Sequence, residues 1–171
     1  MKVVFWYSEC VGCNTRILLD IFMKKQRDFY QISLKLLLKN EKGEVLILKA
    51  VDNGSFAGFY DFPGGRIDTD EFEMPFLEII NREAIEEIGS DVSFEVKPRP
   101  VSIGRHLIPE SMNSSCRDIK VMYIFFEGEY KSVKIKISEE HIGYEWIDIK
   151  KENPEKYFKS GILEAIKIYL L

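Results

Sequence analysis

Residues 63–71 read Pro-Gly-Gly-Arg-Ile-Asp-Thr-Asp-Glu, and residues 82–89 read Arg-Glu-Ala-Ile-Glu-Glu-Ile-Gly. The proline and the two glycines continue neither a strand nor a helix, so we expect a tight turn whose backbone can approach a ligand closely. The second stretch overlaps the end of residues 75–88, a segment with about one apolar residue per helical turn. This spacing predicts a helix whose core-facing stripe is formed by Leu77, Ile80, Ala84 and Ile88.

The predicted helix carries three carboxylates on one side. Glu83 and Glu87 are one turn apart, and Glu86 lies beside them. Like charges at this spacing repel one another, and a hard cation would remove that repulsion. Oxygen ligands favour Mg²⁺ or Mn²⁺, and a backbone carbonyl of the glycine turn would complete the metal shell. The alternative is a solvated acidic face that ends at Gly89, but the upstream turn favours the metal site.

Together these stretches resemble the box of the Nudix family. In that box a glycine, five residues, a glutamate and seven residues precede Arg-Glu-U-x-Glu-Glu-x-Gly-U, where U is aliphatic. Gly65 and Glu71 fit the first half with the correct spacing, and residues 82–89 fit the second half. Two features depart from the pattern: ten residues rather than seven separate Glu71 from Arg82, and Ser90 stands at the last aliphatic position.

The difference in spacing amounts to a three-residue insertion between Glu71 and Arg82. Because the helical periodicity that follows is unbroken, we place the extra residues in an enlarged loop at residues 71–75. The family pattern pairs the arginine with the glutamate at position 71. Glu73 and Glu78 are the alternative partners in this chain.

The resemblance implies an α/β fold, the Nudix α/β/α sandwich with a mixed β-sheet. We assign it to residues 29–171, preceded by an N-terminal extension at residues 1–28. The sequence patterns agree, since alternating or apolar runs predict strands at residues 32–38, 45–48, 92–96, 120–126, 133–137 and 144–149, and residues 59–62 lead into the glycine turn. The run at residues 120–126 is nearly all apolar, which favours a central strand. A C-terminal helix is expected after an N-cap at Ser160.

The chain has 171 residues, 46% of them hydrophobic, and a formal net charge of -4. That length supports one compact domain with a substantial core. No apolar run approaches the ~20 residues that span a bilayer. A mildly acidic balance argues against nonspecific nucleic-acid binding, which requires a basic patch. We therefore expect a cytoplasmic protein with neither a membrane nor a nucleic acid as partner.

The N-terminal extension contains Cys10 and Cys13, which are half the ligand set of a zinc site. The chain has 3 cysteines and 2 histidines in all, so a second pair at comparable spacing is missing. Reduced structural thiols are therefore favoured over a zinc or redox site. Homodimerisation is common in the family that the chain resembles, and a homodimer in which this extension contributes is one expectation.

The resemblance implies an enzyme of the hydrolase class. Its substrate would be a nucleoside diphosphate linked to another moiety, such as a nucleotide sugar or ADP-ribose, and the pyrophosphate bond would be cleaved with Mg²⁺ or Mn²⁺. The same resemblance makes Glu83 and Glu87 the first metal ligands, with Glu86 next and the Gly65 carbonyl as a fourth. Arg82 would hold the loop through a carboxylate rather than touch the substrate.

The catalytic base varies within the resembled family and is often a glutamate outside the box. Glu139 and Glu140 are candidates in this chain, and Glu86 is a third; a capping turn is the alternative role for residues 138–141. Substrate contacts are expected from basic side chains, since arginine can clamp a phosphate and histidine can stack on a base. The candidates, for which surface salt bridges are the alternative, are Arg66, Arg99, Arg105 and His106.

Three other functions share this fold. Residues 63–71 are also similar to GDP-mannose mannosyl hydrolases, which cleave at the sugar and depart from the box at the glutamate after the arginine. Glu83 is present here, so pyrophosphate cleavage is favoured. The intact carboxylates argue against a catalytically silent nucleotide-binding module. An isoprenoid diphosphate isomerase would need a catalytic cysteine, and Cys116 has no recognisable motif around it.

Overall fold

The computed structural model describes residues 27–51, 56–132 and 134–171. The hypotheses on Cys10, Cys13 and the rest of residues 1–26 lie outside these residues. Within them, no helix is both long and apolar enough to cross a membrane. The elements are β1 (Gln31–Lys39), β2 (Val45–Ala50), β3 (Tyr60–Asp61), α2 (Phe76–Ile88), β4 (Ser93–Ile108), η1 (Glu110–Met112), β5 (Ile119–Ser132), β6 (His141–Ile147), η2 (Pro154–Lys156) and α3 (Ser160–Tyr169).

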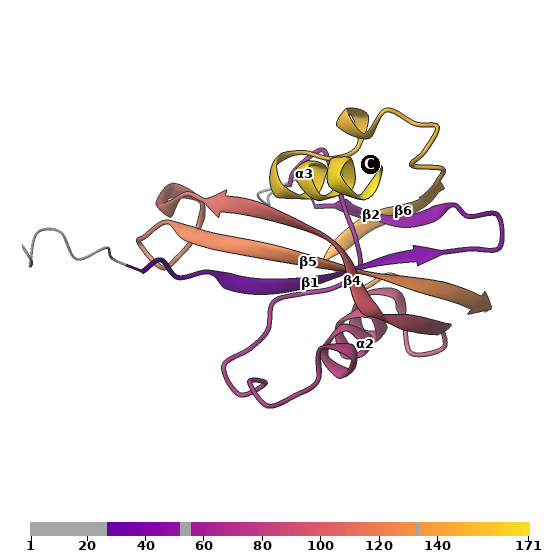
Figure 1. The fold of residues 1–171 in the computed structure, drawn as a ribbon, viewed down its shortest axis with the longest axis horizontal. Coiled ribbons are helices and arrows are strands. Elements are labelled where there is room, and N and C mark those ends of the chain that lie inside the picture. The colour runs from indigo at the N-terminus through magenta and orange to yellow at the C-terminus, as the bar shows by residue number, and fades with distance from the viewer. Residues whose placement is uncertain (1–26, 52–55, 133) are drawn as a thin grey trace, which may run out of the picture.

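A six-stranded sheet lies between the two helices, with α2 against one face and α3 against the other (Figure 1). The strand order is β3-β2-β1-β5-β4, and β6 pairs with β2. β1 and β5 run parallel over nine residue pairs from Gln31↔Val121 to Lys39↔Glu129, whereas the other pairings are antiparallel. This confirms the predicted α/β/α sandwich with a mixed sheet; β5 lies inside the sheet, between β1 and the edge strand β4.

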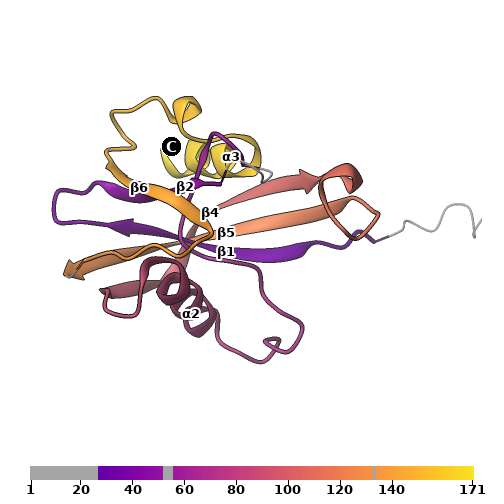
Figure 2. The same cartoon turned by 180° about the vertical axis from the view of Figure 1, so that it is seen from behind.

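β1 is buried on both faces, which explains its run of leucines. Successive side chains of a strand point to opposite faces. Leu34, Leu36 and Leu38 accordingly pack with α2 in one core. Leu37 points the other way and packs with residues of β5, α3 and the segment after η2 in a second core. Seen from behind, the same two layers enclose the sheet (Figure 2).

The sheet is longer than the sequence patterns indicate. The strand predicted at residues 92–96 is longer in the structure, where β4 continues past Pro98 and Pro100 to Ile108. The register with β5 shifts between Val96 and Pro100, so the prolines lie at a bulge, where a missing N–H breaks no regular ladder.

The strand expected at residues 133–137 is wrong over its described part, because residues 134–138 belong to no strand. Their amides bond to the end of α2 instead: Lys136 N donates to Ile88 O at 3.0 Å, and Ser138 N donates to Glu87 O at 2.9 Å. Ile135 is 6% exposed in the core beneath α2. The alternation therefore reflects packing over the helix end, and it carries the chain to His141, where β6 begins.

α3 lies very close to β4, where two glycines face each other. A Cβ on Gly104 would lie 1.9 Å from the Gly161 carbonyl oxygen, and one on Gly161 would lie 2.4 Å from the Arg105 carbonyl oxygen. The expected N-cap at Ser160 is wrong, since Lys159 occupies that position and Ser160 is the first helical residue. The Ser160 hydroxyl instead lies 2.7 Å from His106 Nδ1.

Replacing Gly104 by alanine tests this close contact. The new methyl group would meet a main-chain oxygen that cannot move alone, so we expect Gly104→Ala to lower the free energy of unfolding by about 1–3 kcal/mol. Urea unfolding followed by circular dichroism measures the difference. Gly143→Ala is the matched control, because its nearest neighbour would be Lys49 Cβ at 3.9 Å. Equal stability of the two variants would contradict the packing described.

Candidate active site

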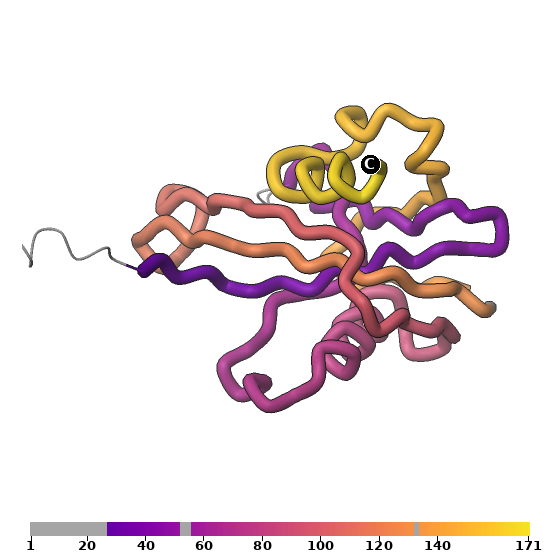
Figure 3. Tube along the Cα trace, in the orientation of Figure 1, coloured from indigo at the N-terminus to yellow at the C-terminus, as the bar shows by residue number. Residues whose placement is uncertain are grey.

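The glycine turn lies along β1 like a short additional strand. Leu36 N donates to Pro63 O at 2.8 Å, Leu34 N donates to Gly65 O at 2.9 Å, and Ile67 N donates to Ile32 O at 2.9 Å. The Cα trace shows the long loop running out along β1 before it returns to α2 (Figure 3). The Gly65 carbonyl, which the sequence suggested as a metal ligand, is thus bonded to β1.

Both glycines of the turn lie in close contact with their neighbours. Gly64 has a φ of +128, and a Cβ there would lie 2.2 Å from the Leu34 carbonyl oxygen. A Cβ on Gly65 would lie 2.1 Å from Glu83 Oε2. Glycine is therefore required at position 64 by the β1 backbone, whereas a side chain at position 65 would displace the Glu83 carboxylate from the turn.

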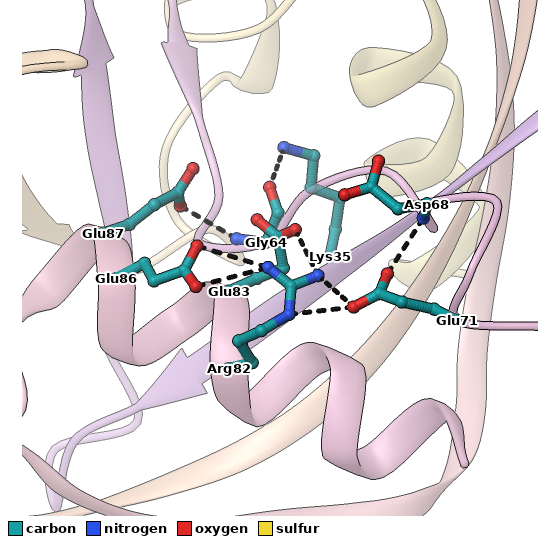
Figure 4. A network of polar contacts seen from close by, with 8 residues as sticks. All are labelled: Lys35, Gly64, Asp68, Glu71, Arg82, Glu83, Glu86 and Glu87. Carbon is teal, nitrogen blue, oxygen red and sulfur yellow. Dashed lines mark hydrogen bonds and ion pairs between the residues drawn. The ribbon is translucent and has the colours of Figure 1, made fainter. Parts of the chain in front are cut away.

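Arg82 joins the loop to the acidic helix (Figure 4). Its Nε and Nη2 donate to Glu71 Oε1 at 2.9 and 2.5 Å. Its Nη2 also lies 3.0 Å from Glu83 Oε1, and its Nη1 lies 3.2 Å from Glu86 Oε2. The partner of Arg82 is therefore Glu71. The inserted residues project from this loop, with Phe72 86% exposed.

Glu71 and Glu83, the two best-buried partners of Arg82, have pKa values shifted in opposite directions. The Asp68 amide donates to Glu71 Oε2 at 2.9 Å, and this bond, together with Arg82, holds the pKa of Glu71 below its usual value despite partial burial. Burial raises the pKa of Glu83, because Arg82 offsets only part of the desolvation and Glu87 and Glu86 add like charge. Glu83 thus has the environment of a carboxylate that would gain from a further cation.

Glu87 is 8% exposed and faces both the turn and β6. Its Oε2 accepts a hydrogen bond from Gly64 N at 2.9 Å. Its Oε1 lies 3.5 Å from His141 Nε2. Neither ring nitrogen of His141 has a hydrogen-bond partner among the described residues, although both are buried. The segment that bonds to the end of α2 brings this histidine to Glu87.

Lys35 was not singled out from the sequence. Its Nζ donates to Asp61 Oδ2 at 2.8 Å, to Phe62 O at 3.3 Å and to Gly64 O at 2.8 Å. Burial acts to lower the pKa of Lys35, but the charges of Asp61 and Glu87 outweigh it and raise the pKa. In the sequence Lys35 alternates with leucines and looks solvent-facing; nothing local distinguishes it from an exposed lysine.

A cavity of about 460 Å³ opens between the turn, α2 and β6. Its lining includes Glu83 and Glu87 from the box. The polar lining also includes Lys35, Asp61 and His141, and Phe56 and Tyr123 are its aromatic members. The predicted residues that contribute to this lining are Gly65, Arg66, Glu83, Glu87 and Glu140.

The other predicted residues do not line this cavity. Glu86 and Arg82 pair on the outer side of α2, and Glu139 is exposed in the turn before β6. Arg99 is exposed on β4, and Arg105 Nη2 lies 3.3 Å from Glu164 Oε1.

His106 lies just behind the cavity. Its ring centroid is 5.1 Å from that of Phe56 and 6.3 Å from that of Tyr123. Burial and the charge of Lys159 lower the pKa of His106. The histidine therefore supports two aromatic residues of the lining rather than facing the carboxylates.

The side chains at the cavity bear on whether a divalent metal fits there. Within the described parts of the chain, no three His, Cys, Asp or Glu side chains converge on one point. Glu86 faces Arg82, whereas Glu83 and Glu87 both reach the cavity wall. Carboxylate oxygens beside a main-chain carbonyl, that of Gly64, are the ligand type of Mg²⁺ and Mn²⁺. The residues therefore fit such an ion by their chemistry.

Solved structures of known proteins share this fold. A MutT protein from Methanosarcina mazei Go1 is 27% identical, with a TM-score of 0.60 over 85% of this chain and 94% of its own. An ADP-ribose pyrophosphatase from Streptococcus suis 89-1591 is 16% identical, with a TM-score of 0.54 over 83% and 90%. An Ap4A hydrolase from C. elegans is 16% identical, with a TM-score of 0.55 over 81% and 94%. No curated protein matches the chain.

A family model decides the assignment. The NUDIX domain model matches residues 30–166, a range that contains the glycine turn, α2 and every residue of the cavity lining. The pairing of Arg82 with Glu71 follows the pattern of the box despite the inserted residues. The chain therefore belongs to the Nudix hydrolase family.

Proposed function

We propose that the protein hydrolyses the pyrophosphate bond of a nucleoside diphosphate linked to another moiety, with Mg²⁺ or Mn²⁺ as cofactor. The observation that supports this proposal is that Glu83, Glu87, Arg66 and Glu140 all line one cavity. Carboxylates for a metal, a cation for phosphate and a free acid are the groups that this hydrolysis needs. ADP-ribose and dinucleoside polyphosphates are tested first, because proteins of similar fold are named for them.

The metal would be held by Glu83 and Glu87, with Glu86 able to join if it leaves Arg82. When bound, it would polarise the phosphate oxygens and lower the pKa of the attacking water. Arg82 is a positioning residue, since its guanidinium is occupied by Glu71, Glu83 and Glu86. Its role is to keep the loop and the acidic face of α2 together.

The proposed base is Glu140. It lines the cavity, whereas Glu139 does not, and Glu86 is paired with Arg82. Glu140 is exposed in the turn before β6, so its carboxylate can accept a proton from water in the cavity. This assignment selects one of the three bases that the sequence left open.

Arg66 is the proposed phosphate ligand. It is exposed, it lines the cavity, and its Nη1 donates to Gln31 Oε1 at 3.0 Å, which leaves other donors of the guanidinium for substrate. Arg99, Arg105 and His106 lie outside the lining, so a role in substrate binding is assigned to Arg66 ahead of them. Phe56 and Tyr123 offer the faces on which a base could stack.

A cytoplasmic location, homodimerisation and the boundary between residues 1–28 and 29–171 stay predictions from the sequence. Fractionation, analytical ultracentrifugation and limited proteolysis would examine them in turn.

The function is tested by incubating the purified full chain with Mg²⁺ or Mn²⁺ and a substrate panel. The panel contains ADP-ribose, nucleotide sugars, dinucleoside polyphosphates, nucleoside triphosphates and isopentenyl diphosphate, with products resolved by chromatography. We expect metal-dependent release of a nucleoside monophosphate from one substrate, abolished by EDTA. Release of free sugar would establish mannosyl-hydrolase chemistry instead. Thermal stabilisation by a nucleotide without turnover would establish a binding module.

The metal assignment is tested by Glu83→Gln. Loss of one carboxylate ligand removes several kcal/mol of charge stabilisation, and ~1.4 kcal/mol is tenfold, so we expect kcat to fall about 100-fold or more. Glu78→Gln is the matched control, because Glu78 is exposed in the first turn of the same helix and away from the cavity. Wild-type activity of a folded Glu83→Gln variant would refute the assignment.

The base assignment is tested by comparing neighbours. We expect Glu140→Gln to lower kcat by about 10²–10⁴-fold, the usual contribution of a positioned base, and Glu139→Gln to change it little. Steady-state rates at saturating metal measure both variants, and circular dichroism checks their folds. The reverse order of effects would move the base to Glu139, and wild-type rates in both would return the role to Glu86.

A further inference from the structure

A second cavity, of about 720 Å³, adjoins the first cavity, which is lined by Glu83 and Glu87, and Arg66 and Asp68 line both. Sites for small molecules are commonly of this size. The wall of the second cavity is formed by the start of β1, the loop after the glycine turn and the start of α2. Its apolar members are Tyr30, Ile32, Ile67, Phe72 and Phe76.

Three aromatic rings of the second cavity are open to solvent. Phe72 is 86% exposed, Phe76 is 46% exposed and Tyr30 is 38% exposed. Phe72 lies in the loop that the three inserted residues enlarge, and Phe76 is the first residue of α2. Exposed apolar groups that gather at one cavity indicate a binding site. Aromatic rings stack on planar ligands, and every nucleobase offers a planar face.

Arg66 lies at the boundary between the two cavities. Its Nη1 donates to Gln31 Oε1 at 3.0 Å, and Gln31 lines the second cavity but not the first. The guanidinium has more N–H donors than this one bond uses, so donors are left for a phosphate. A phosphate bound by Arg66 in the first cavity would therefore hold its next substituent at the entrance of the second.

The charges of the second cavity limit what can enter it. Arg66 is the one cation of its described lining, which contains three carboxylates, those of Asp68, Asp70 and Glu71. Arg82 already neutralises Glu71, whereas Asp68 and Asp70 are exposed. These carboxylates would repel a further phosphate or another anion, but not an uncharged ring. The rings and the charges together favour an uncharged planar group.

We propose that the second cavity binds the base of a second nucleoside, so that the preferred substrate is a dinucleotide whose two nucleosides are joined through a pyrophosphate. In this second-base site the base lies against Phe72 and Phe76, while Arg66 binds the linking phosphate. The base of the first nucleoside stacks on Phe56 and Tyr123. The inference rests on the pyrophosphohydrolase function proposed above.

The test compares two compounds that differ by one base. Diadenosine diphosphate is ADP-ribose with a second adenine on the terminal ribose. Addition of water across the pyrophosphate gives two AMP from the first compound, and AMP with ribose 5-phosphate from the second. With Mg²⁺ or Mn²⁺, we expect the full wild-type chain to have a kcat/KM about tenfold higher for diadenosine diphosphate, the size of effect that stacking of one base produces. Chromatography of the released AMP measures both rates.

Removing the rings should remove the preference. We expect Phe72→Ala/Phe76→Ala to lower kcat/KM for diadenosine diphosphate about tenfold and to leave that for ADP-ribose near the wild-type value. Phe72→Tyr/Phe76→Tyr keeps both rings and should keep the preference. Phe29→Ala is the matched control, because Phe29 is 85% exposed and lies outside both cavities. Calorimetric titration in EDTA measures binding of both compounds without added metal, and circular dichroism checks the folds.

The outcomes separate the second-base site from the hydrolase function. Equal kcat/KM for the two compounds in the wild type, or a preference that survives loss of the rings, would overturn the second-base site alone. Equal losses with both compounds would also overturn it, because the rings would then contact a part that both compounds share. A dimer that the double variant dissociates, with no change for either compound, would assign the rings to a second copy of the chain instead.

The calorimetric titration decides the case in which no compound of the panel is hydrolysed. Binding of diadenosine diphosphate that is tighter than that of ADP-ribose and is weakened by loss of the rings would then overturn the hydrolase function and keep the second-base site. Absence of binding as well would overturn both proposals.

Discussion

The close approach of Gly64 and Gly65 to their neighbours is the constraint on which the rest of the site depends. The turn lies against the Leu34 carbonyl on one side and the Glu83 carboxylate on the other. A Cβ on Gly64 would lie 2.2 Å from the Leu34 carbonyl oxygen, and a Cβ on Gly65 would lie 2.1 Å from Glu83 Oε2. With the turn pinned in this way, Gly64 can present its amide to Glu87 and its carbonyl to Lys35. The acidic helix and the central strand are therefore held together through one short piece of backbone.

Charge balance explains why so many acids can share this space. Arg82 joins Glu71, Glu83 and Glu86, and Lys35 joins Asp61 near Glu87. Two cations thus offset much of the repulsion before any metal arrives. Arg82 does this at the outer side of α2 and Lys35 at the inner wall of the cavity. Between them, Glu83 and Glu87 remain at the cavity, which is where the chemistry of a pyrophosphohydrolase would place them.

The position of the site follows from the packing of β1, which is covered on both faces. One face of β1 packs on α2, which carries the carboxylates, and the other packs toward α3 and the segment that precedes it. The end of α2 also receives the segment that leads to β6, and this delivers Glu140 and His141 to the cavity. Residues 134–138, whose alternation resembles that of a strand, therefore connect the end of α2 to β6.

The sequence by itself determined the family box, the helix that carries Glu83, Glu86 and Glu87, the glycine turn and most of the strands. These follow from local periodicity and from spacing along the chain, which short-range geometry translates directly into structure. Only the tertiary structure decided that Arg82 pairs with Glu71, that Glu140 rather than Glu139 reaches the cavity, and that Lys35 is buried. Each of these depends on contacts between segments distant in sequence. Local pattern cannot tell a lysine that faces water from one that is covered by a turn folded back on its strand.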